Sequence, residues 1–155
     1  MNAPLDAETF RLVVASTPLV AIDLVIDDGA GRFLLGLRKN RPAKGAWFVP
    51  GGRIYKNERL DDAFTRIAAA ELGPHAIGKT RENARFLGVF EHLYEDGFGG
   101  AEASTHYVVL GYAFTVTGLD LATLPSAQHG EYRLVTRDAL LADARVHDNT
   151  RRYFV

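Results

Sequence analysis

The sequence predicts one α/β domain, spanning residues 1–155, with a mixed β-sheet and helices on its faces. Three stretches rich in branched and aromatic residues, at 19–26, 85–94 and 105–116, are typical of strands. Residues 60–72 instead follow the spacing of an amphipathic helix. Strands and helices interleave without the regular alternation of a doubly wound fold, and this order predicts a mixed sheet. A chain of 155 residues can bury roughly 70% of the surface that its unfolded form exposes.

The N-terminal part of the chain predicts a helix followed by a hairpin. The helix covers residues 5–15, with Asp6 as a candidate cap, and Pro18 follows its end. The strand at 19–26 then meets a turn at Asp28 and Gly29, and residues 33–37 are expected to pair with it as the second arm of the hairpin.

The helix at 60–72 is the strongest pattern in the chain. Its apolar residues recur three and four positions apart, as on the buried face of a helix, at Ala63, Phe64, Ile67, Ala68 and Leu72. Asn57 is the expected cap at its start, and Gly73 with Pro74 marks its end.

The remaining segments complete the predicted order. The strand at 105–116 is the longest and is expected inside the sheet, while the acidic, glycine-rich stretch 95–102 is expected to be a flexible loop. The other segments are a polar connection at 74–82, a linker at 118–125, a short strand at 128–135, a capped helix at 136–142 and a helical turn at 151–154.

Composition excludes several classes of function. The net charge of −1, with both signs spread along the chain, gives no basic stripe of the kind that binds nucleic acid. The absence of cysteine excludes disulfides and thiolate metal sites. No apolar run approaches the roughly 18 residues that span a bilayer, and the first 20 residues lack the pattern of a secretory leader. We therefore expect a cytoplasmic protein with no membrane or nucleic-acid partner.

Residues 50–73, PGGRIYKNERLDDAFTRIAAAELG, place a glycine turn before the central helix. The polar face of that helix carries Asp61, Asp62, Arg66 and Glu71. Glycines expose backbone amides and carbonyls, and carboxylates supply the oxygen ligands that hard cations prefer. The segment could therefore hold a metal ion and a phosphate.

The same segment, at 52–74, resembles the Nudix box, in which glycine, five residues, glutamate and seven residues precede the motif Arg-Glu-aliphatic-x-Glu-Glu-x-Gly. Gly52, Glu58, Arg66, Glu71 and Gly73 match this pattern. The resemblance implies the Nudix fold, an α/β/α sandwich around a mixed sheet. It also implies hydrolysis of a nucleoside diphosphate derivative with a divalent metal.

Two glutamates of the box are missing, because Ile67 and Ala70 stand in their places. In this the chain resembles the GDP-mannose mannosyl hydrolase subfamily, and the similarity extends through STPLVAIDLV, FLLGLRKNRPAKGAWFVPGGR, THYVVLGYAF and the segment around Gln128 and His129. This resemblance implies hydrolysis of GDP-mannose, and also GDP-glucose, to GDP and free sugar. Water would attack the anomeric carbon with inversion, with one Mg²⁺ per site for which Mn²⁺ can substitute, in a homodimer.

The metal site is expected to hold a single ion. Glu71 and the carbonyl of Gly51 are too few ligands for two or three metals, but one Mg²⁺ fills its octahedron with substrate oxygens and water. By match to the subfamily, Gln128 is the expected third ligand, and its neutral oxygen leaves the site less negative than an ordinary Nudix site.

Three further residues are candidates for contacts with the substrate. Asp23, the one charge inside the apolar strand 19–26, is either a structural acid or a substrate contact, and the subfamily resemblance favours the sugar pocket. Arg38 and Arg53 flank the glycine turn, and a guanidinium fork suits a diphosphate, so both are predicted to contact the diphosphate or the transition state as catalytic residues. Lys39, Arg41 and Lys44 of the same basic loop are expected on the surface.

Breaking the carbon–oxygen bond requires a general base but no general acid, because the nucleoside diphosphate leaves as an anion. Five histidines compete for this role. His75 and His147 lie in polar segments, and His92 and His106 lie on strands, where a structural role is the commoner one. His129 stands beside the proposed ligand Gln128 and also matches the subfamily, so it is the predicted base; His92 is kept as a substrate-binding candidate.

Tyr107 and Arg66 are assigned to stabilisation of the leaving group, and Tyr107 also to substrate binding. The alternatives are a core aromatic for Tyr107 and a salt bridge to Asp62 for Arg66, worth only a few tenths of a kcal/mol. No guanine pocket can be located, although Phe10, Tyr94 or Phe98 could stack on the base.

The sequence leaves two alternative functions. A Nudix pyrophosphohydrolase would release GMP and sugar 1-phosphate, but the missing carboxylates at positions 67 and 70 weigh against it. A non-catalytic sensor of nucleotide sugars would better suit a chain that had also lost Glu71, Gln128 and His129, and all three are present.

Overall fold

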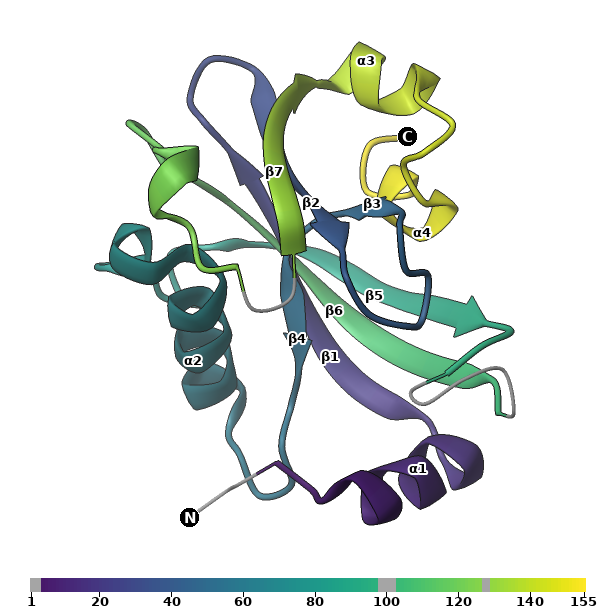
Figure 1. Ribbon diagram of the computed structural model, residues 1–155. Coiled ribbons are helices and arrows are strands. Elements are labelled where there is room, and N and C mark those ends of the chain that lie inside the picture. Colours follow the sequence, from purple (N-terminus) through teal and green to yellow (C-terminus); the bar gives the residue numbers. More distant parts are fainter. Residues whose placement is uncertain (1–3, 98–102, 127–128) are drawn as a thin grey trace.

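A computed structural model describes residues 4–97, 103–126 and 129–155 (Figure 1). Within these ranges the helices are α1 Ala7–Ser16, α2 Leu60–Leu72, α3 Arg137–Ala142 and α4 Asp148–Arg151, with two 3-10 turns, η1 Gly73–Ala76 and η2 Leu121–Thr123. The strands are β1 Leu19–Asp27, β2 Arg32–Arg38, β3 Trp47–Phe48, β4 Gly51–Arg53, β5 Arg85–Tyr94, β6 Thr105–Thr115 and β7 His129–Thr136.

The described strands form one mixed sheet in the order β3-β2-β1-β6-β5, with β4 paired to β1 and β7 paired to β2. β1 runs parallel to β6, and the other paired strands are antiparallel. β6 lies between β1 and β5, as predicted for the longest strand. The branching of the sheet at β1 and β2 brings β4 and β7 close to the same central strands, and this arrangement builds the site described below.

Helix α2 lies on one side of the sheet and the C-terminal helices α3 and α4 on the other, so the predicted α/β/α sandwich is confirmed (Figure 1). An apolar cluster packs against each face. One cluster joins Ile22, Leu24 and Ile26 of β1 to the apolar face of α2. The other lies on the opposite face, where Val25 and Leu35 pack with residues of the C-terminal segment that include Leu140 and Phe154. Because alternate residues of a strand point to opposite faces, the apolar strand β1 serves both layers.

The central helix α2 has the predicted length, but its predicted cap is wrong. Arg59, not Asn57, is the N-cap residue, and its side chain makes no capping hydrogen bond. Asn57 has φ 67° and lies in the preceding turn, a backbone region that asparagine tolerates better than most residues. Gly73, with φ 55°, ends the helix as expected. At the N-terminus, Asp6 caps α1 by accepting from the amide of Thr9, as predicted.

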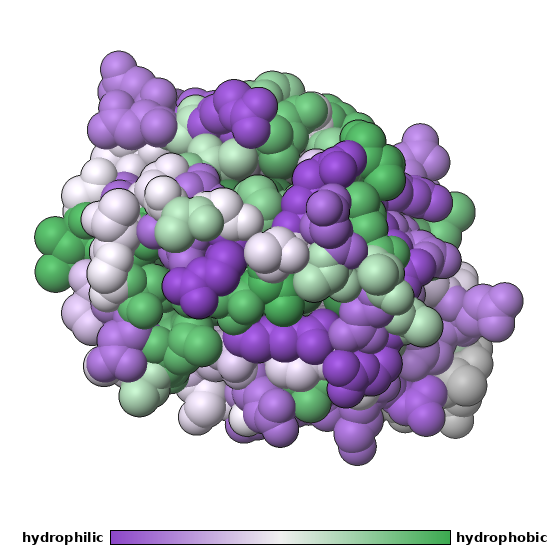
Figure 2. Space-filling model, turned by 90° about the horizontal axis from the view of Figure 1, so that it is seen from above, coloured by the Kyte–Doolittle hydropathy of each residue, from purple (hydrophilic) through white to green (hydrophobic). Residues whose placement is uncertain are grey.

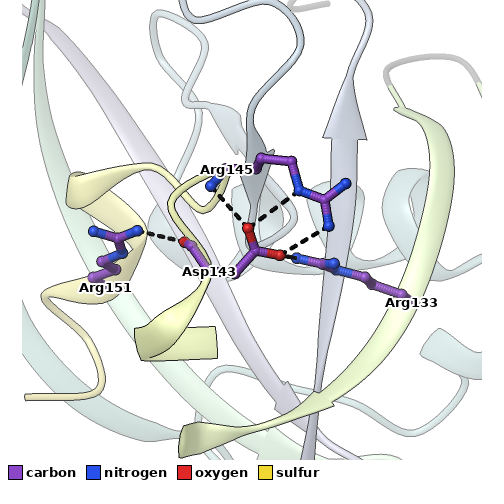
Figure 3. Close-up of polar contacts among 4 residues, drawn as sticks. All are labelled: Arg133, Asp143, Arg145 and Arg151. Atoms are coloured by element: carbon purple, nitrogen blue, oxygen red, sulfur yellow. Dashed lines mark hydrogen bonds and ion pairs between the residues drawn. The ribbon is translucent and has the colours of Figure 1, made fainter. Parts of the chain in front are cut away.

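The Asp143 carboxylate is one of the groups that bind the C-terminal segment to the sheet. Asp143 Oδ1 accepts from the backbone amide and Nε of Arg145, and Oδ2 accepts from Nη2 of both Arg133 and Arg145 (Figure 3). Its backbone carbonyl accepts from Arg151. These bonds tie β7 to the stretch that carries α4, and this stretch returns to the site.

Hydrophilic and hydrophobic residues intermingle on the face of the molecule shown in Figure 2. Exposed large hydrophobic side chains include Leu12 of α1 and Val89 and Leu93 of β5. Among the described residues, no helix combines the length and apolar character needed to cross a membrane.

Candidate active site

A cavity of about 220 Å³ opens between the glycine turn, α2 and the central strands. Nine of the ten site residues predicted from the sequence line it: Asp23, Arg38, Gly51, Arg53, Arg66, Glu71, His92, Tyr107 and His129. They come from β1, β2, β4, α2, β5, β6 and β7, which only the tertiary structure brings together. The tenth, Gln128, lies outside the described residues.

Glu71 and His129 form the centre of the cavity. The Oε2 atom of Glu71 lies 3.3 Å from Nε2 of His129, and their side chains are 5% and 2% exposed. The His129 ring occupies space that only glycine leaves free, because a Cβ at Gly36 would overlap it. Nδ1 of His129 is buried with no hydrogen-bond partner in the described part of the chain.

His129 lies in the strand predicted at 128–135: it is the first residue of β7 and the cross-strand partner of Arg38 on β2. Strand pairing therefore sets the position of both side chains, since side chains opposite each other on adjacent strands lie close together.

Of the other histidines, only His92 lines the cavity among the described residues. His75 bonds to the Thr123 hydroxyl at 2.9 Å, and His147 caps α4 by accepting from the amide of Asn149. His106 does not line the cavity, whereas His92 does. Among the ion pairs of the described residues, Glu71 pairs with His129, whereas His92 pairs with Asp23.

The helix face toward the cavity carries one carboxylate. Ile67 packs against Gly52, where an added Cβ would lie 3.0 Å from its side chain, and Ala70 lines the cavity as a small apolar residue. No group of three or more acidic or histidine side chains in the described ranges could hold a metal ion.

These residues nevertheless fit one divalent ion. Glu71 is buried, and among the described residues it has no Arg or Lys in an ion pair. A buried carboxylate is costly unless a cation or donors offset its charge, and magnesium accepts one or two carboxylates with carbonyl, water and phosphate oxygens. The Glu71 carboxylate and the neighbouring backbone of Gly51 are suitable donors for such an ion.

Asp23 is held on two sides. Its Oδ2 accepts a 2.7 Å hydrogen bond from the hydroxyl of Tyr153, and its Oδ1 lies against Gly51, where a Cβ would overlap it. Burial raises the pKa of Asp23 to about 7, against the opposing effects of the Tyr153 hydrogen bond and the charge of Arg38. Asp23 is thus an acceptor that shares the cavity with Glu71.

His92 lies beside Asp23, with Nδ1 3.9 Å from Oδ2. Burial, followed by the positive charges of Arg152 and His147, lowers the pKa of His92 to about 4. The imidazole is therefore neutral near pH 7, and its buried Nε2 has no hydrogen-bond partner in the ranges described. A neutral ring with an unpaired nitrogen can bond to a polar group of a ligand.

Two arginines are oriented by neighbouring groups. Nε of Arg38 donates to the carbonyl of Pro42 at 3.0 Å, and its guanidinium lies 5.6 Å from the centre of the Phe48 ring. The guanidinium of Arg53 lies 4.0 Å from the centre of the Phe10 ring of α1. Each guanidinium can present further donors to an anion.

Arg66 is already bonded within the protein. Its Nε and Nη2 donate to the two carboxylate oxygens of Glu58 at 2.6 and 2.9 Å, and Nη2 also donates to the carbonyl of Arg53 at 2.8 Å. The alternative pairing with Asp62 is not the one found. Glu58 and Arg66, two residues of the box motif, thus hold the end of β4 at Arg53.

Aromatic residues form much of the remaining wall. Tyr107 lines the cavity, and burial raises its pKa, so its hydroxyl is a donor near pH 7. Phe48, Tyr55 and Tyr94 also line the cavity but were not predicted as site residues. Phe48 and Tyr94 stand in strand-like sequence that resembles core, although Tyr94 is also a candidate for stacking on the base.

Comparisons with known proteins place the chain in a family. A family model described as the NUDIX domain matches residues 17–154. A protein of Haloferax volcanii, "Low-salt glycan biosynthesis protein Agl8", is 42% identical over 127 residues that cover 82% of this chain and 76% of the relative. An "ADP-ribose pyrophosphatase" of Methanocaldococcus jannaschii is 29% identical over 127 residues, covering 82% and 67%.

Solved structures agree on the fold. The MutT protein of Methanosarcina mazei has a TM-score of 0.68 at 19% identity, over 90% of this chain and 92% of that one. The NUDIX domain of Shewanella oneidensis NrtR, complexed with ADP ribose, has a TM-score of 0.64 at 18% identity, over 97% and 95%. With the family model matching most of its length, the chain belongs to the NUDIX domain family and is a Nudix hydrolase.

Proposed function

We propose that the protein is a GDP-mannose mannosyl hydrolase, which converts GDP-mannose to GDP and mannose by attack of water at the anomeric carbon with inversion. The observation that carries the proposal is the reduced carboxylate set of α2. Glu71 faces the cavity, while Ile67 and Ala70 occupy the positions of the two missing glutamates. Such a site suits one metal ion that neutralises a diphosphate leaving group.

Mg²⁺ is the proposed cofactor, with Mn²⁺ able to replace it. Glu71, the carbonyl of Gly51 and the side chain of Gln128 would hold it. When bound, the ion supplies positive charge to the diphosphate oxygens as the leaving group gains negative charge.

Arg38, Arg53 and Tyr107 would stabilise the leaving GDP. Both guanidiniums lie at the cavity with their orientation set by Pro42 and Phe10, and the protonated hydroxyl of Tyr107 can donate to a phosphate oxygen. Arg66 would contribute by holding the end of β4, because its Nη2 donates to the carbonyl of Arg53. Preorganised donors of this kind stabilise charge that develops in the transition state.

His129 would act as the general base through Nε2, the ring nitrogen next to Glu71. The carbon–oxygen bond to GDP breaks, the water oxygen bonds to the anomeric carbon from the opposite side, and the water proton passes to the imidazole and then to solvent. Asp23 and His92 would bond to hydroxyls of the sugar, since both have acceptor or donor atoms at the cavity.

The size of the cavity and the sequence relatives support a sugar nucleotide. A volume of about 220 Å³ is below the roughly 300–1,000 Å³ of pockets that enclose drug-sized ligands, so the cavity suits the sugar and diphosphate end of the substrate. The relative that is 42% identical is named for glycan biosynthesis, a process that consumes activated sugars. GDP-glucose would be a second substrate.

A pyrophosphohydrolase is the second candidate function. It is favoured by the relative of 29% identity that is named an ADP-ribose pyrophosphatase. The two candidates break different bonds and therefore give different products. In this second reaction GMP and mannose 1-phosphate would appear in place of GDP and mannose.

Anion-exchange chromatography of the products from GDP-mannose and Mg²⁺ tests the proposal. GDP with an equal amount of mannose is the expected result. GMP with mannose 1-phosphate would overturn it and support the pyrophosphohydrolase.

A homodimer is part of the same proposal. Exposed apolar residues such as Leu12, Val89 and Leu93 offer surface for the contact between the two subunits. Light scattering measures the mass in solution.

A further inference from the structure

Tyr153, near the C-terminus, contacts a residue of the candidate active site without lining the cavity. Its hydroxyl donates to Oδ2 of Asp23 at 2.7 Å, although the two residues are 130 positions apart in the sequence. Tyr153 does not line the cavity, whereas Asp23 does. The tyrosine therefore contacts a candidate substrate-binding group from the side that is away from the substrate.

The ring of Tyr153 is packed firmly. Its centre lies 4.6 Å from that of Phe90 and 6.0 Å from that of His92, both on β5. Gly111 on β6 leaves room for it, since a Cβ there would lie 3.0 Å from the ring. The position of the hydroxyl is thus set by the sheet itself.

The backbone around Tyr153 is also held in place. Nη1 of Arg152 donates to the carbonyl of Glu91 at 3.1 Å, and Nε of Arg137 donates to the carbonyl of Phe154 at 2.7 Å. Earlier in the segment, Asp143 joins Arg133, Arg145 and Arg151 (Figure 3). The C-terminal segment therefore forms a rigid support behind Asp23.

We propose that Tyr153 is a positioning residue that fixes the Asp23 carboxylate for recognition of the hexosyl group of the substrate. The Tyr153 hydroxyl donates a hydrogen bond to Oδ2, and Oδ1 lies against Gly51, where the missing Cβ leaves room for it. These two contacts confine the carboxylate to one orientation. A carboxylate fixed in this way can accept hydrogen bonds from sugar hydroxyls without first losing rotational freedom. This inference rests on the proposed function, which places Asp23 in the sugar pocket.

Binding rather than turnover provides the test. Calorimetry with Mg²⁺ in the His129→Gln background measures the affinity for GDP-mannose relative to the affinity for GDP. We expect Tyr153→Phe, which keeps the ring and removes the hydroxyl, to lower this ratio about fivefold to tenfold, within the range for loss of one typical hydrogen bond. Asp23→Ala should lower it at least as much, and adding Tyr153→Phe to Asp23→Ala should lower it no further.

Tyr112→Phe is the matched control. It removes another largely buried tyrosine hydroxyl, one that Nη1 of Arg81 reaches at 3.4 Å, but Tyr112 packs against α2 and does not line the cavity. The ratio should be unchanged in this variant.

Two results would overturn the inference. One is a double variant in which the separate effects multiply, because Tyr153 would then act independently of Asp23. The other is an equal loss of affinity for GDP and GDP-mannose in Tyr153→Phe, which would indicate a general structural role. Neither depends on which bond is hydrolysed, so the outcome is separate from that of the product analysis.

Discussion

Nε2 of His129 lies 3.3 Å from Oε2 of Glu71, inside a cavity in which both side chains are almost fully buried. One residue begins β7 and the other lies in the last turn of α2, so the contact joins the sheet to the helix of the box motif. In the proposed function the histidine takes the proton of water and the glutamate holds the metal ion. Their roles can be separated by substitution.

His129→Gln should lower kcat by roughly 10² to 10⁴, the range for loss of a general base. Because glutamine keeps a polar group of similar reach and Glu71 remains, Mg²⁺ affinity should stay nearly unchanged. Steady-state kinetics and a metal titration on the same sample measure the two quantities. Full activity in the variant would transfer the role of base to His92 or another group.

Glu71→Gln should weaken Mg²⁺ binding and activity together, because the neutral amide replaces the one α2 carboxylate that faces the cavity. Asp62→Asn is the matched control, since Asp62 is an exposed acid on the same helix. A titration of activity against Mg²⁺ gives both the apparent affinity and the maximum rate. An unchanged Mg²⁺ affinity in Glu71→Gln would contradict the single-ion site.

Gly36→Ala should displace the His129 ring, because the new Cβ would overlap it. We expect loss of activity and a destabilisation of about 1–3 kcal/mol, typical of overpacking in a buried site. Gly130→Ala is the control on β7, where a Cβ meets nothing closer than Lys39 at 3.8 Å. Activity assays and urea unfolding should separate the variants, and normal activity in Gly36→Ala would show that the ring position is not critical.

The stability of the protein should depend on the titration of Asp23. Burial raises its pKa from 3.8 to about 7, so between these values the folded state retains a proton that the unfolded chain releases. This contribution to stability is fully present below pH 3.8 and is lost as pH rises through about 7. The free energy of unfolding of the wild type should therefore fall, relative to that of Asp23→Asn, as pH rises through this window.

Urea unfolding of the two proteins at several pH values in this range, with metal removed by chelation, measures the difference. Comparing the two proteins cancels the opposite dependence of stability on pH that Asp143 contributes. The pKa of Asp143 is lowered, first of all by its hydrogen bond with Arg145. A difference that does not vary with pH would mean that Asp23 titrates near its ordinary value in the folded protein.

The sequence predicted the elements whose pattern is local, and nine of the ten predicted site residues line one cavity. The apolar spacing of 60–72 and the match to the box motif were sufficient for α2 and Glu71. The N-cap was missed because Asn57 satisfies the demands of a turn, with φ 67°, rather than those of a helix start.

Other features depended on contacts between distant segments. Tyr153 could not be linked to Asp23, because no local pattern reports a hydrogen bond across 130 positions. The position of His129 opposite Arg38 arises from pairing with a strand about 90 residues earlier, a separation over which strand register cannot be read from the sequence. Arg66 pairs with Glu58, eight positions before it and outside the helix, so the expected helical spacing of a salt bridge did not apply.

The most direct measurement of the central claim is hydrolysis of GDP-mannose in water enriched in heavy oxygen, with the position of the label read by mass spectrometry. Attack at the anomeric carbon predicts that the label appears in mannose and that GDP is unlabelled. Label in GDP, GMP or mannose 1-phosphate would mean attack at phosphorus, and would contradict the proposal that this one-carboxylate site directs water to carbon.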